Sequence, residues 1–582
     1  MEDKKVLLSV KDLEVKFRVR GRILTAIRGI SLDIYENESI AIVGESGSGK
    51  SVFTKTFAGM LDENGFISNG TLVFSDDALA DTCAVKGKAE LQMIEEARIK
   101  LDEYSKLEFG KDIYHEMTAL KNEKKQRAHI NTEKEELMRA EIADLKYRST
   151  EAYNLKQTLD PKADKEQIKR IAAEIKIMNG DIKEKEKALE AAEKEAEKAL
   201  ANDHAYLEEY GKKMDALKDE YEKAVHHEIS EKTKARNVVL AKEICLSVDR
   251  YGGFKGRKLE KQLLEELKNA MREGLDLDDE LVRNKVFDKV AFRVRYLDET
   301  EEKLHGTCIL NLANIKFSKD WGQIRGSRIA TVFQDPMTSL NPIITIGKQI
   351  TSVILKHQNC SEAEARERAL ILMKKVGIPN AEHRFDDYPF QYSGGMRQRI
   401  VIAIALSCQP KILICDEPTT ALDVTIQAQI LKLLKDLQKE FNYTIVFITH
   451  DLGVVANIAD RVAVLYAGQV VELGTVEEVF YDPRHPYTWA LLSSLPQLAQ
   501  RNTKLYSISG TPPSLYNKIV GDPFAPRNPH CLKIDTLKEP PMFKVTETHY
   551  AKTWLLDPRA PKVEKPEAID NIHEKLINAF NI

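Results

Sequence analysis

An eight-residue stretch near the N-terminus restricts the fold of this chain more than any other segment. It runs from Gly44 to Ser51 and fits the pattern G-x-x-x-x-G-K-S. Glycines let the backbone curl so that successive N–H groups point at phosphate oxygens, and the lysine and serine add a positive charge and a Mg²⁺ ligand. We therefore predict a phosphate-binding loop for a nucleotide, made by Gly44, Glu45, Ser46, Gly47, Ser48, Gly49, Lys50 and Ser51.

The segments on either side of this loop support the prediction. Residues 39–43 form a short apolar run that reads as a buried strand, and residues 52–60 read as a helix whose N-terminus faces the phosphates. Before them, residues 6–38 alternate apolar and polar, which predicts an antiparallel hairpin with its turn near Gly21. Phe17 lies near the end of that hairpin, and the residues alone leave two interpretations open, a core aromatic or a ring that stacks on adenine.

Composition excludes some functions. With a net charge of only −4 over 582 residues, bulk charge gives no reason to expect binding to nucleic acid or anionic lipid. The seven cysteines contain no C-x-x-C pair and read as reduced thiols of a cytosolic protein. We see neither a signal peptide nor an apolar run of about 18 residues, so a membrane function would need another chain to supply the span.

The composition of the sequence changes at about residue 75, and from there to about residue 305 it is rich in lysine and glutamate. From Pro161 to His226 apolar residues keep a spacing of three and four, which predicts a coiled-coil seam, and residues 88–157 form a rougher helical stretch. Asp160-Pro161 suits a helix start between the two, so we expect a long antiparallel helical hairpin. A mixed segment richer in β-branched residues follows, at 238–248 and 286–296. This largely helical region, which we call the arm, is either a solvated spacer or a device that docks a partner.

Three later apolar segments, at 328–333, 411–417 and 443–450, read as strands that end in polar residues. At the end of the second, Asp416 can hold Mg²⁺ and Glu417 can polarise an attacking water. His450 lies at a strand end, where ligands of an open α/β sheet gather, and is a candidate contact for the γ-phosphate. Gln334 directly follows the first of these strands.

Ser393-Gly394-Gly395 opens a predicted helix and so offers free N–H groups to an anion. A chain needs only one phosphate-binding loop for its own nucleotide. A second helix start of this kind therefore suggests a site shared between two chains.

The order of these motifs resembles the ATPase domain of ABC transporters. The resemblance implies that Phe17 stacks on adenine, that Gln334 links Mg²⁺ to a transmembrane partner, and that Asp423 belongs to the D-loop at 421–423. It also implies that Lys50 and Ser51 face Ser393 and Gly395 of a second subunit across ATP.

The resemblance to the oligopeptide/dipeptide importer ATPases is closer than that to ABC ATPases in general, and it covers about residues 1–76 and 307–560. It is carried by Phe333-Gln-Asp-Pro-Met-Thr-Ser-Leu-Asn-Pro342, Asp416-Glu-Pro-Thr-Thr-Ala-Leu-Asp-Val-Thr425 and His485-Pro-Tyr-Thr-Trp-Ala-Leu-Leu492, and Met396-Arg397 looks like the D-type subunit. It implies an ATP- and Mg²⁺-dependent motor at the cytoplasmic face of the cell membrane, bound peripherally, with no nucleic acid partner. The implied partners are two transmembrane permease subunits, an F-type ABC ATPase subunit and, through the permeases, an extracellular peptide-binding protein.

The expected fold is an α/β P-loop NTPase of the ABC type, with a RecA-like core, an antiparallel β subdomain and a helical signature subdomain. We expect this ATPase domain at residues 1–76 and 307–480, a mainly helical insertion at 77–306, and a peptide-importer-type extension at 481–582.

One departure concerns a family stretch that commonly carries the cysteines of an iron–sulfur cluster. Here Asp522, Asn528, Asp535 and Thr553 take the expected cysteine positions, and Cys531 alone cannot hold a cluster bound by four cysteines. We expect the shape of this region to be kept and the cluster to be missing.

Competing functions are a soluble ABC ATPase with a coiled-coil arm acting on DNA or ribosomes, a translation-associated ABC protein, and an inactive subunit. The arm precedes Gln334 and has no hook motif, which counts against the first. The presence of only one phosphate-binding loop counts against a translation-associated ABC protein. The presence of Lys50, Glu417 and His450 counts against an inactive subunit.

Overall fold

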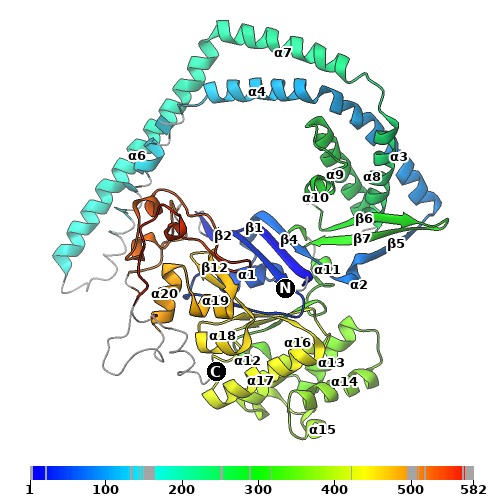
Figure 1. The fold of residues 1–582 in the computed structure, drawn as a ribbon, viewed down its shortest axis with the longest axis vertical. Coiled ribbons are helices and arrows are strands. Elements are labelled where there is room, and N and C mark those ends of the chain that lie inside the picture. The colour runs from blue at the N-terminus through cyan, green and yellow to red at the C-terminus, as the bar shows by residue number, and fades with distance from the viewer. Residues whose placement is uncertain are drawn as a thin grey trace. The chain divides into compact units, whose positions relative to one another are not determined.

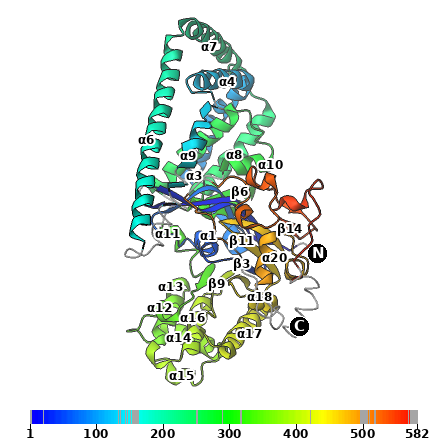
Figure 2. The same cartoon turned by 90° about the vertical axis from the view of Figure 1, so that its left-hand side faces the viewer.

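Figures 1 and 2 show the chain as a computed structural model. The structure describes residues 4–566 and 569, apart from 20–21, 132–133, 136, 143, 146–147, 150–151, 153–163, 250–252, 288–289, 316–317, 421, 495–507, 509 and 517–518. The chain divides into two compact units. One is built from Met1–Thr82, Asp288–Arg293 and Thr307–Ile582, and the other from Cys83–Phe287 and Val294–Gly306. The second unit is therefore an insertion in the sequence of the first.

The first unit contains an eight-stranded sheet with the order β13-β14-β12-β11-β3-β10-β9-β8. The five strands from β8 to β11 run parallel, and β12, β14 and β13 extend the sheet antiparallel. All residues of β3 and β10 are buried, as expected for central parallel strands. The bounds are β3 Ser39–Val43, β8 Ile329–Val332, β9 Ile412–Asp416, β10 Thr444–Ile448, β11 Arg461–Tyr466, β12 Gln469–Thr475, β13 Phe543–Lys544 and β14 Tyr550–Ala551.

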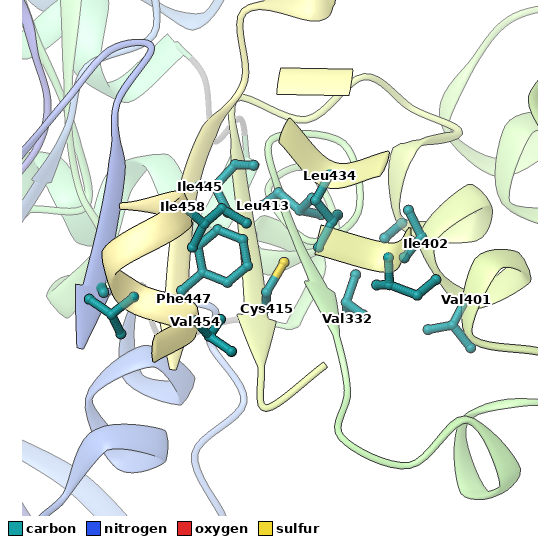
Figure 3. Packing of buried hydrophobic residues seen from close by; sticks show 14 of the residues in the cluster. Val332, Val401, Ile402, Leu413, Cys415, Leu434, Ile445, Phe447, Val454 and Ile458 are labelled. Carbon is teal, nitrogen blue, oxygen red and sulfur yellow. The ribbon is translucent and has the colours of Figure 1, made fainter. Parts of the chain in front are cut away.

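Figure 3 shows how side chains of this sheet meet those of helices α16 (Gly394–Leu406), α17 (Val424–Phe441) and α18 (Leu452–Ile458). The labelled residues are Val332, Leu413, Cys415, Ile445 and Phe447 from the strands and Val401, Ile402, Leu434, Val454 and Ile458 from the helices. The same core includes α13 (Ile346–His357) and α14 (Glu362–Lys375). The predicted α/β class is confirmed. The other described helices of this unit are α1 Lys50–Phe57, α2 Asp77–Ala80, α11 Ser318–Trp321, α12 Pro336–Ser339, α15 Ala381–Arg384, α19 Val476–Tyr481 and α20 Pro486–Ser493. Its described 3-10 turns are η2 Leu312–Asn314, η3 Pro389–Gln391, η5 Ala525–Arg527, η6 Lys533–Thr536 and η7 Trp554–Leu556.

A second, antiparallel sheet contains the N-terminal strands β1 (Val6–Val19), β2 (Arg22–Tyr35) and β4 (Gly65–Phe74). Strand β1 lies between β2 and β4 and pairs antiparallel with both. The end of β7 (Lys303–Asn311) pairs with β4 through Asn311 and Leu310. The predicted antiparallel hairpin over residues 6–38 is confirmed, whereas its turn at Gly21 lies outside the described residues.

The inserted unit is mainly helical. Lys124 and Arg127 of α4 lie over the rings of Tyr210 and Tyr206 of α7, at 4.5 and 4.1 Å from the ring centres. Further along, Ile142 packs in a small core with Ile182 and Leu189 of α6. The chain before residues 153–163 therefore lies beside the chain after them, whereas Asp160-Pro161 itself falls in the part that is not described. The bounds are α3 Lys88–Ser105, η1 Lys106–Gly110, α4 Lys111–Arg127, α6 Lys165–Asn202, α7 His204–Ala224, α8 Glu231–Asp249, α9 Gly253–Arg272, α10 Glu280–Phe287, β5 Asp81–Val85 and β6 Phe292–Glu299.

The segment that the sequence favoured as mixed, at 238–248, is entirely helical and lies within α8. Leu240, Ile244 and Val248 are four residues apart and buried, so they lie on one face of the helix. Burial of this face outweighs the preference of the valines for β-strands. The stretch at 286–296 does contain the start of strand β6.

The C-terminal part returns to the edge of the large sheet, where Ala551 of β14 pairs with Glu472 of β12. The Glu472 carboxylate is fully buried, and it accepts hydrogen bonds from the His485 N–H and from the His549 ring. This network anchors the C-terminal chain to the ATPase sheet. In the described parts of the chain, no helix is long and apolar enough to cross a membrane.

Candidate active site

Four parallel strands end at one edge of the large sheet and deliver the predicted site residues there. Strand β3 leads into the loop at Gly44, β8 precedes Gln334, β9 ends at Asp416, and β10 precedes His450. Because carboxyl ends of parallel strands meet at the same edge, residues more than 400 positions apart in sequence become neighbours.

The loop between β3 and α1 needs glycine at two places where a side chain would not fit. A Cβ on Gly44 would lie 2.2 Å from the Leu465 carbonyl oxygen, and the φ angle there is +150°. Gly49, the residue before α1, has a φ angle of +102°. These positions let the backbone curl around the start of α1, whose free N–H groups face an anion.

Lys50 is the first residue of α1 and is buried. Its Nζ donates to the carbonyl oxygens of Gly44 and Glu45, at 2.8 and 2.9 Å. Burial lowers the pKa of Lys50, while the carboxylates of Glu417, Asp416 and Glu45 act in the opposite direction. The ammonium is therefore held inside the loop by backbone oxygens that phosphate oxygens can replace.

Asp416 and Ser51 bring two hard oxygen atoms together. The Ser51 hydroxyl donates to Asp416 Oδ1 at 3.3 Å. Burial is the main cause that raises the pKa of Asp416, the Glu417 carboxylate adds to it, and the Ser51 hydrogen bond and the Lys50 and Lys55 charges oppose it. A cation between these oxygens would relieve that burial cost, and such donors suit Mg²⁺.

Glu417 is the centre of a hydrogen-bond network at the strand edge. Its carboxylate accepts from Gln334 Nε2 at 3.0 Å and from the Thr420 hydroxyl at 3.1 Å, and it lies 3.1 Å from His450 Nδ1. Its backbone has a φ angle of +45°, which a non-glycine residue rarely adopts. Such strained backbone clusters at functional sites, and Glu417 lines the cavity.

These groups line a single cavity of about 470 Å³. Its walls are Ser46, Gly47, Gly49, Lys50, Ser51, Gln334, Asp416, Glu417 and His450, together with Leu24, Ala26, Val52 and Leu515. The sequence prediction missed the last four. The positions of Leu24 and Ala26 depend on strand register and that of Leu515 on the return of the C-terminal chain, whereas Val52 directly follows Ser51 in α1. Gly44, Glu45 and Ser48 belong to the loop but do not line the cavity.

Phe17 is not among the lining residues. It is buried in β1, opposite Leu24 of β2 and Gly65 of β4, and its ring lies 2.7 Å from where a Gly65 Cβ would be. Leu24 reaches the cavity wall instead, and so does Leu515, whose carbonyl oxygen accepts the Thr25 N–H at 3.2 Å. The structure therefore does not bring Phe17 to the cavity, and its stacking on adenine stays a prediction.

The signature residues also lie away from this cavity. Ser393 caps α16, with its hydroxyl accepting the Met396 N–H at 3.3 Å, and Asp423 caps α17 by accepting the Ile426 N–H at 3.0 Å. A Cβ on Gly395 would lie 2.7 Å from Ile426, so the two helix starts are close, while one on Gly394 would meet nothing within 4 Å. Within one chain these groups form a second, separate surface.

The four positions expected to carry cluster cysteines hold side-chain oxygens with backbone partners. The oxygens of Asp522, Asn528 and Thr553 each accept the N–H two residues ahead, at 2.9, 2.9 and 3.3 Å, and Asp535 accepts the Leu532 N–H at 2.6 Å. All four residues are buried. They do not fit an iron–sulfur cluster, which needs thiolates at these places, and they cap the turns themselves.

Asp522 makes the stability of this region depend on pH. Burial is the main cause that raises its pKa to about 7, and the Asp535 carboxylate adds to it. Between its ordinary pKa and about 7 the folded state binds more protons than the unfolded state, so the free energy of unfolding falls as pH rises through that range. Asp522→Asn keeps the acceptor for the Phe524 N–H without the charge. We expect this variant to unfold at a higher temperature than the wild type at pH 8, because its free energy of unfolding is greater by on the order of 2–4 kcal/mol. At pH 5 we expect a smaller difference, because only part of the stability has been lost between the ordinary pKa and that pH.

Thermal unfolding of both proteins at the two pH values tests this. Asp557→Asn is the control, because the Asp557 carboxylate is bound by Arg559 and its pKa is lowered to about 2. An equal temperature difference at pH 5 and pH 8 would contradict the role given to Asp522.

Two family comparisons match this chain. The sequence model described as "ABC transporter" matches residues 27–239 and 294–420. The model described as "Oligopeptide/dipeptide transporter, C-terminal region" matches residues 471–534. The first holds the loop and the strand that ends in Asp416, and the second holds β12, α20 and the turns around Asp522.

Curated relatives agree with these matches. The oligopeptide transport ATP-binding protein AmiE of Streptococcus pneumoniae is 67% identical over 266 residues, which are 46% of this chain and 75% of that protein. OppD of Bacillus subtilis, with the same description, is 60% identical over 45% of this chain and 74% of its own length. Among solved structures, a dimeric bacterial ABC transporter cassette, MJ0796, aligns over 81% of this chain and 98% of that one at 15% identity, but its TM-score of 0.36 is too low to add to the assignment.

Proposed function

This chain belongs to the ABC transporter family and, within it, to the ATP-binding proteins of oligopeptide and dipeptide transporters, and we propose that it drives peptide import by hydrolysing ATP. The observation that carries the proposal is that one chain joins a complete set of ATPase groups around one cavity to the C-terminal region of this transporter family. A soluble ATPase acting on DNA or ribosomes would not be expected to have that C-terminal region.

The residues around the cavity have separate roles in this proposal. Backbone N–H groups of the loop and the Lys50 ammonium bind the β- and γ-phosphates. Glu417 accepts a proton from the attacking water, and His450 contacts the γ-phosphate while holding the Glu417 carboxylate in place. Gln334 donates to the same carboxylate and links the nucleotide site to a transmembrane partner subunit.

Ser51 and Asp416 are the residues that would hold Mg²⁺, with Gln334 as a further oxygen donor at the cavity wall. The ion would neutralise charge that develops on the phosphate oxygens. The mutual hydrogen bond between Ser51 and Asp416 would give way to shared coordination.

ATP hydrolysis in this proposal needs a second ATPase subunit. Ser393, Gly394, Gly395 and Asp423 do not line the cavity of their own chain, yet the α16 helix start is suited to an anion. We place these groups opposite the loop of an F-type partner, so that ATP is enclosed between two different chains.

Three exposed apolar side chains of the ATPase unit suit a contact with the permeases. Phe390 is 70% exposed, Met337 61% and Ile343 81%, and they lie in η3, in α12 and shortly before α13. Phe390 also stacks with the half-exposed Tyr388 at 5.9 Å between ring centres. Large exposed apolar side chains are suited to a contact with another protein, and we propose that two transmembrane subunits dock the ATPase pair through these residues, at the cytoplasmic face of the membrane.

Among the described residues of the insertion at 77–306, none lines the cavity. We propose that the chain comprises the ATPase at 1–76 and 307–480, the insertion, and the extension from 481.

Uptake of labelled peptides by the native cell tests the proposed function. We expect uptake of labelled tri- to pentapeptides to stop when the chain is depleted and to return with wild-type protein, because the permeases cannot cycle without ATP hydrolysis. Uptake of a labelled free amino acid is the control and should not change. Peptide uptake that persists after depletion would contradict the proposal.

A further inference from the structure

The C-terminal extension reaches the phosphate-binding loop itself, through Arg527 and Tyr487. Arg527 is almost fully buried, and its guanidinium donates to both carboxylate oxygens of Glu45, at 2.8 and 3.0 Å. The Glu45 N–H donates to the Tyr487 hydroxyl at 2.7 Å. The Glu45 carbonyl oxygen accepts from Lys50. Every polar group of this second loop residue is therefore bound.

The groups that hold Glu45 are themselves fixed. Arg527 also donates to the Tyr466 hydroxyl at 3.1 Å. Tyr466, Tyr487 and Phe524 pack as buried aromatic rings, with centres 4.6 to 5.4 Å apart. Phe524 lies in the turn capped by Asp522, so the turns that stand where cluster cysteines were expected hold Arg527 against the loop.

We propose that Arg527 is a positioning residue for nucleotide binding, which acts through Glu45 to hold the loop open for phosphate. This inference rests on the proposed role of the loop and adds the C-terminal extension to it. Two physical effects support it. A pre-organised loop loses less conformational entropy when it binds its ligand, and a guanidinium on Glu45 cancels a carboxylate next to a site for anionic phosphates.

The charge argument predicts an asymmetry between the two partners. Without Arg527, Glu45 is a mostly buried, unpaired carboxylate beside the loop, and removing one partner of such a pair costs far more than removing both. Without the Glu45 charge, Arg527 still holds the loop and its positive charge favours phosphate. Loss of Arg527 should therefore weaken ATP binding more than neutralisation of Glu45.

Titration of the full chain with a fluorescent ATP analogue and Mg²⁺ tests this in a double-mutant cycle. We expect Arg527→Met to weaken binding about tenfold, Glu45→Gln to change it by less than about threefold, and the double variant to return to within about threefold of Glu45→Gln. Arg527→Lys should fall between wild type and Arg527→Met, because it keeps the charge without the two-pronged contact. In hydrolysis assays the KM should rise while kcat at saturating ATP stays within about twofold.

Arg559→Met is the matched control, since Arg559 lies in the same extension, is 85% exposed and pairs with Asp557. It should bind ATP like the wild type. The proposal is overturned if Arg527→Met binds ATP normally, or if the double variant binds as weakly as Arg527→Met, which would mean that the extension had only lost its fold. Failure of the wild type to bind ATP would instead refute the proposed function and the proposal with it.

Discussion

Glu417→Gln will bind ATP about as tightly as the wild type but will hydrolyse it at least about 100-fold more slowly in the assembled transporter. Glutamine keeps an oxygen that can accept from Gln334 and Thr420, so the network around residue 417 persists. It cannot take a proton from water, because an amide is not a base at neutral pH. The loop and Lys50 are unchanged, so the phosphates are held as before.

Phosphate release by the purified complex measures the first effect, and equilibrium binding of labelled ATP measures the second. Glu440→Gln is the control, since this exposed glutamate pairs with Lys375 away from the cavity. Hydrolysis near the wild-type rate in Glu417→Gln would show that another group activates the water.

Lys50→Ala is expected to lose ATP affinity by about 100-fold or more, since the only buried ammonium among the residues that line the cavity is removed. The carbonyl oxygens of Gly44 and Glu45 would also lose their donor, and the negative carboxylates of Asp416 and Glu417 would face the phosphates without compensation. Hydrolysis should disappear with binding.

Titration of the full chain with the fluorescent ATP analogue tests this second prediction. Lys348→Ala is suited as the control, because Lys348 is an exposed residue of α13 and lies outside the cavity. A circular dichroism spectrum confirms that each variant is folded. ATP affinity close to that of the wild type in Lys50→Ala would place the phosphates somewhere other than this loop.

Sequence reasoning predicted which residues lie together at this sheet edge because its signals are local. Gly44, Lys50, Asp416, Glu417 and His450 each follow or end an apolar strand, and parallel strands bring such positions together whatever lies between them. The insertion at 77–306 does not change this arrangement, because the chain enters it from the antiparallel strands and not from the central sheet.

Other features could not be read from the sequence. Which of Phe17 and Leu24 reaches the cavity depends on strand register and on the face each side chain takes. Leu515 and Arg527 are more than 460 residues away in sequence from the phosphate-binding loop, and nothing in their local sequence indicates that they lie near it. The helix at 238–248 carries β-branched residues that favour strands in isolation, and burial against α3 and α9 decides otherwise.

Purification of the complex that this chain forms tests whether it is the ATP-driven motor of a peptide importer. Tagged Glu417→Gln protein would be recovered with ATP from gently solubilised membranes of the native cell, and its partners identified by mass spectrometry. We expect to recover two multi-span permeases and a second ABC ATPase in equal amounts. Recovery of DNA- or ribosome-bound proteins with no membrane protein would contradict it.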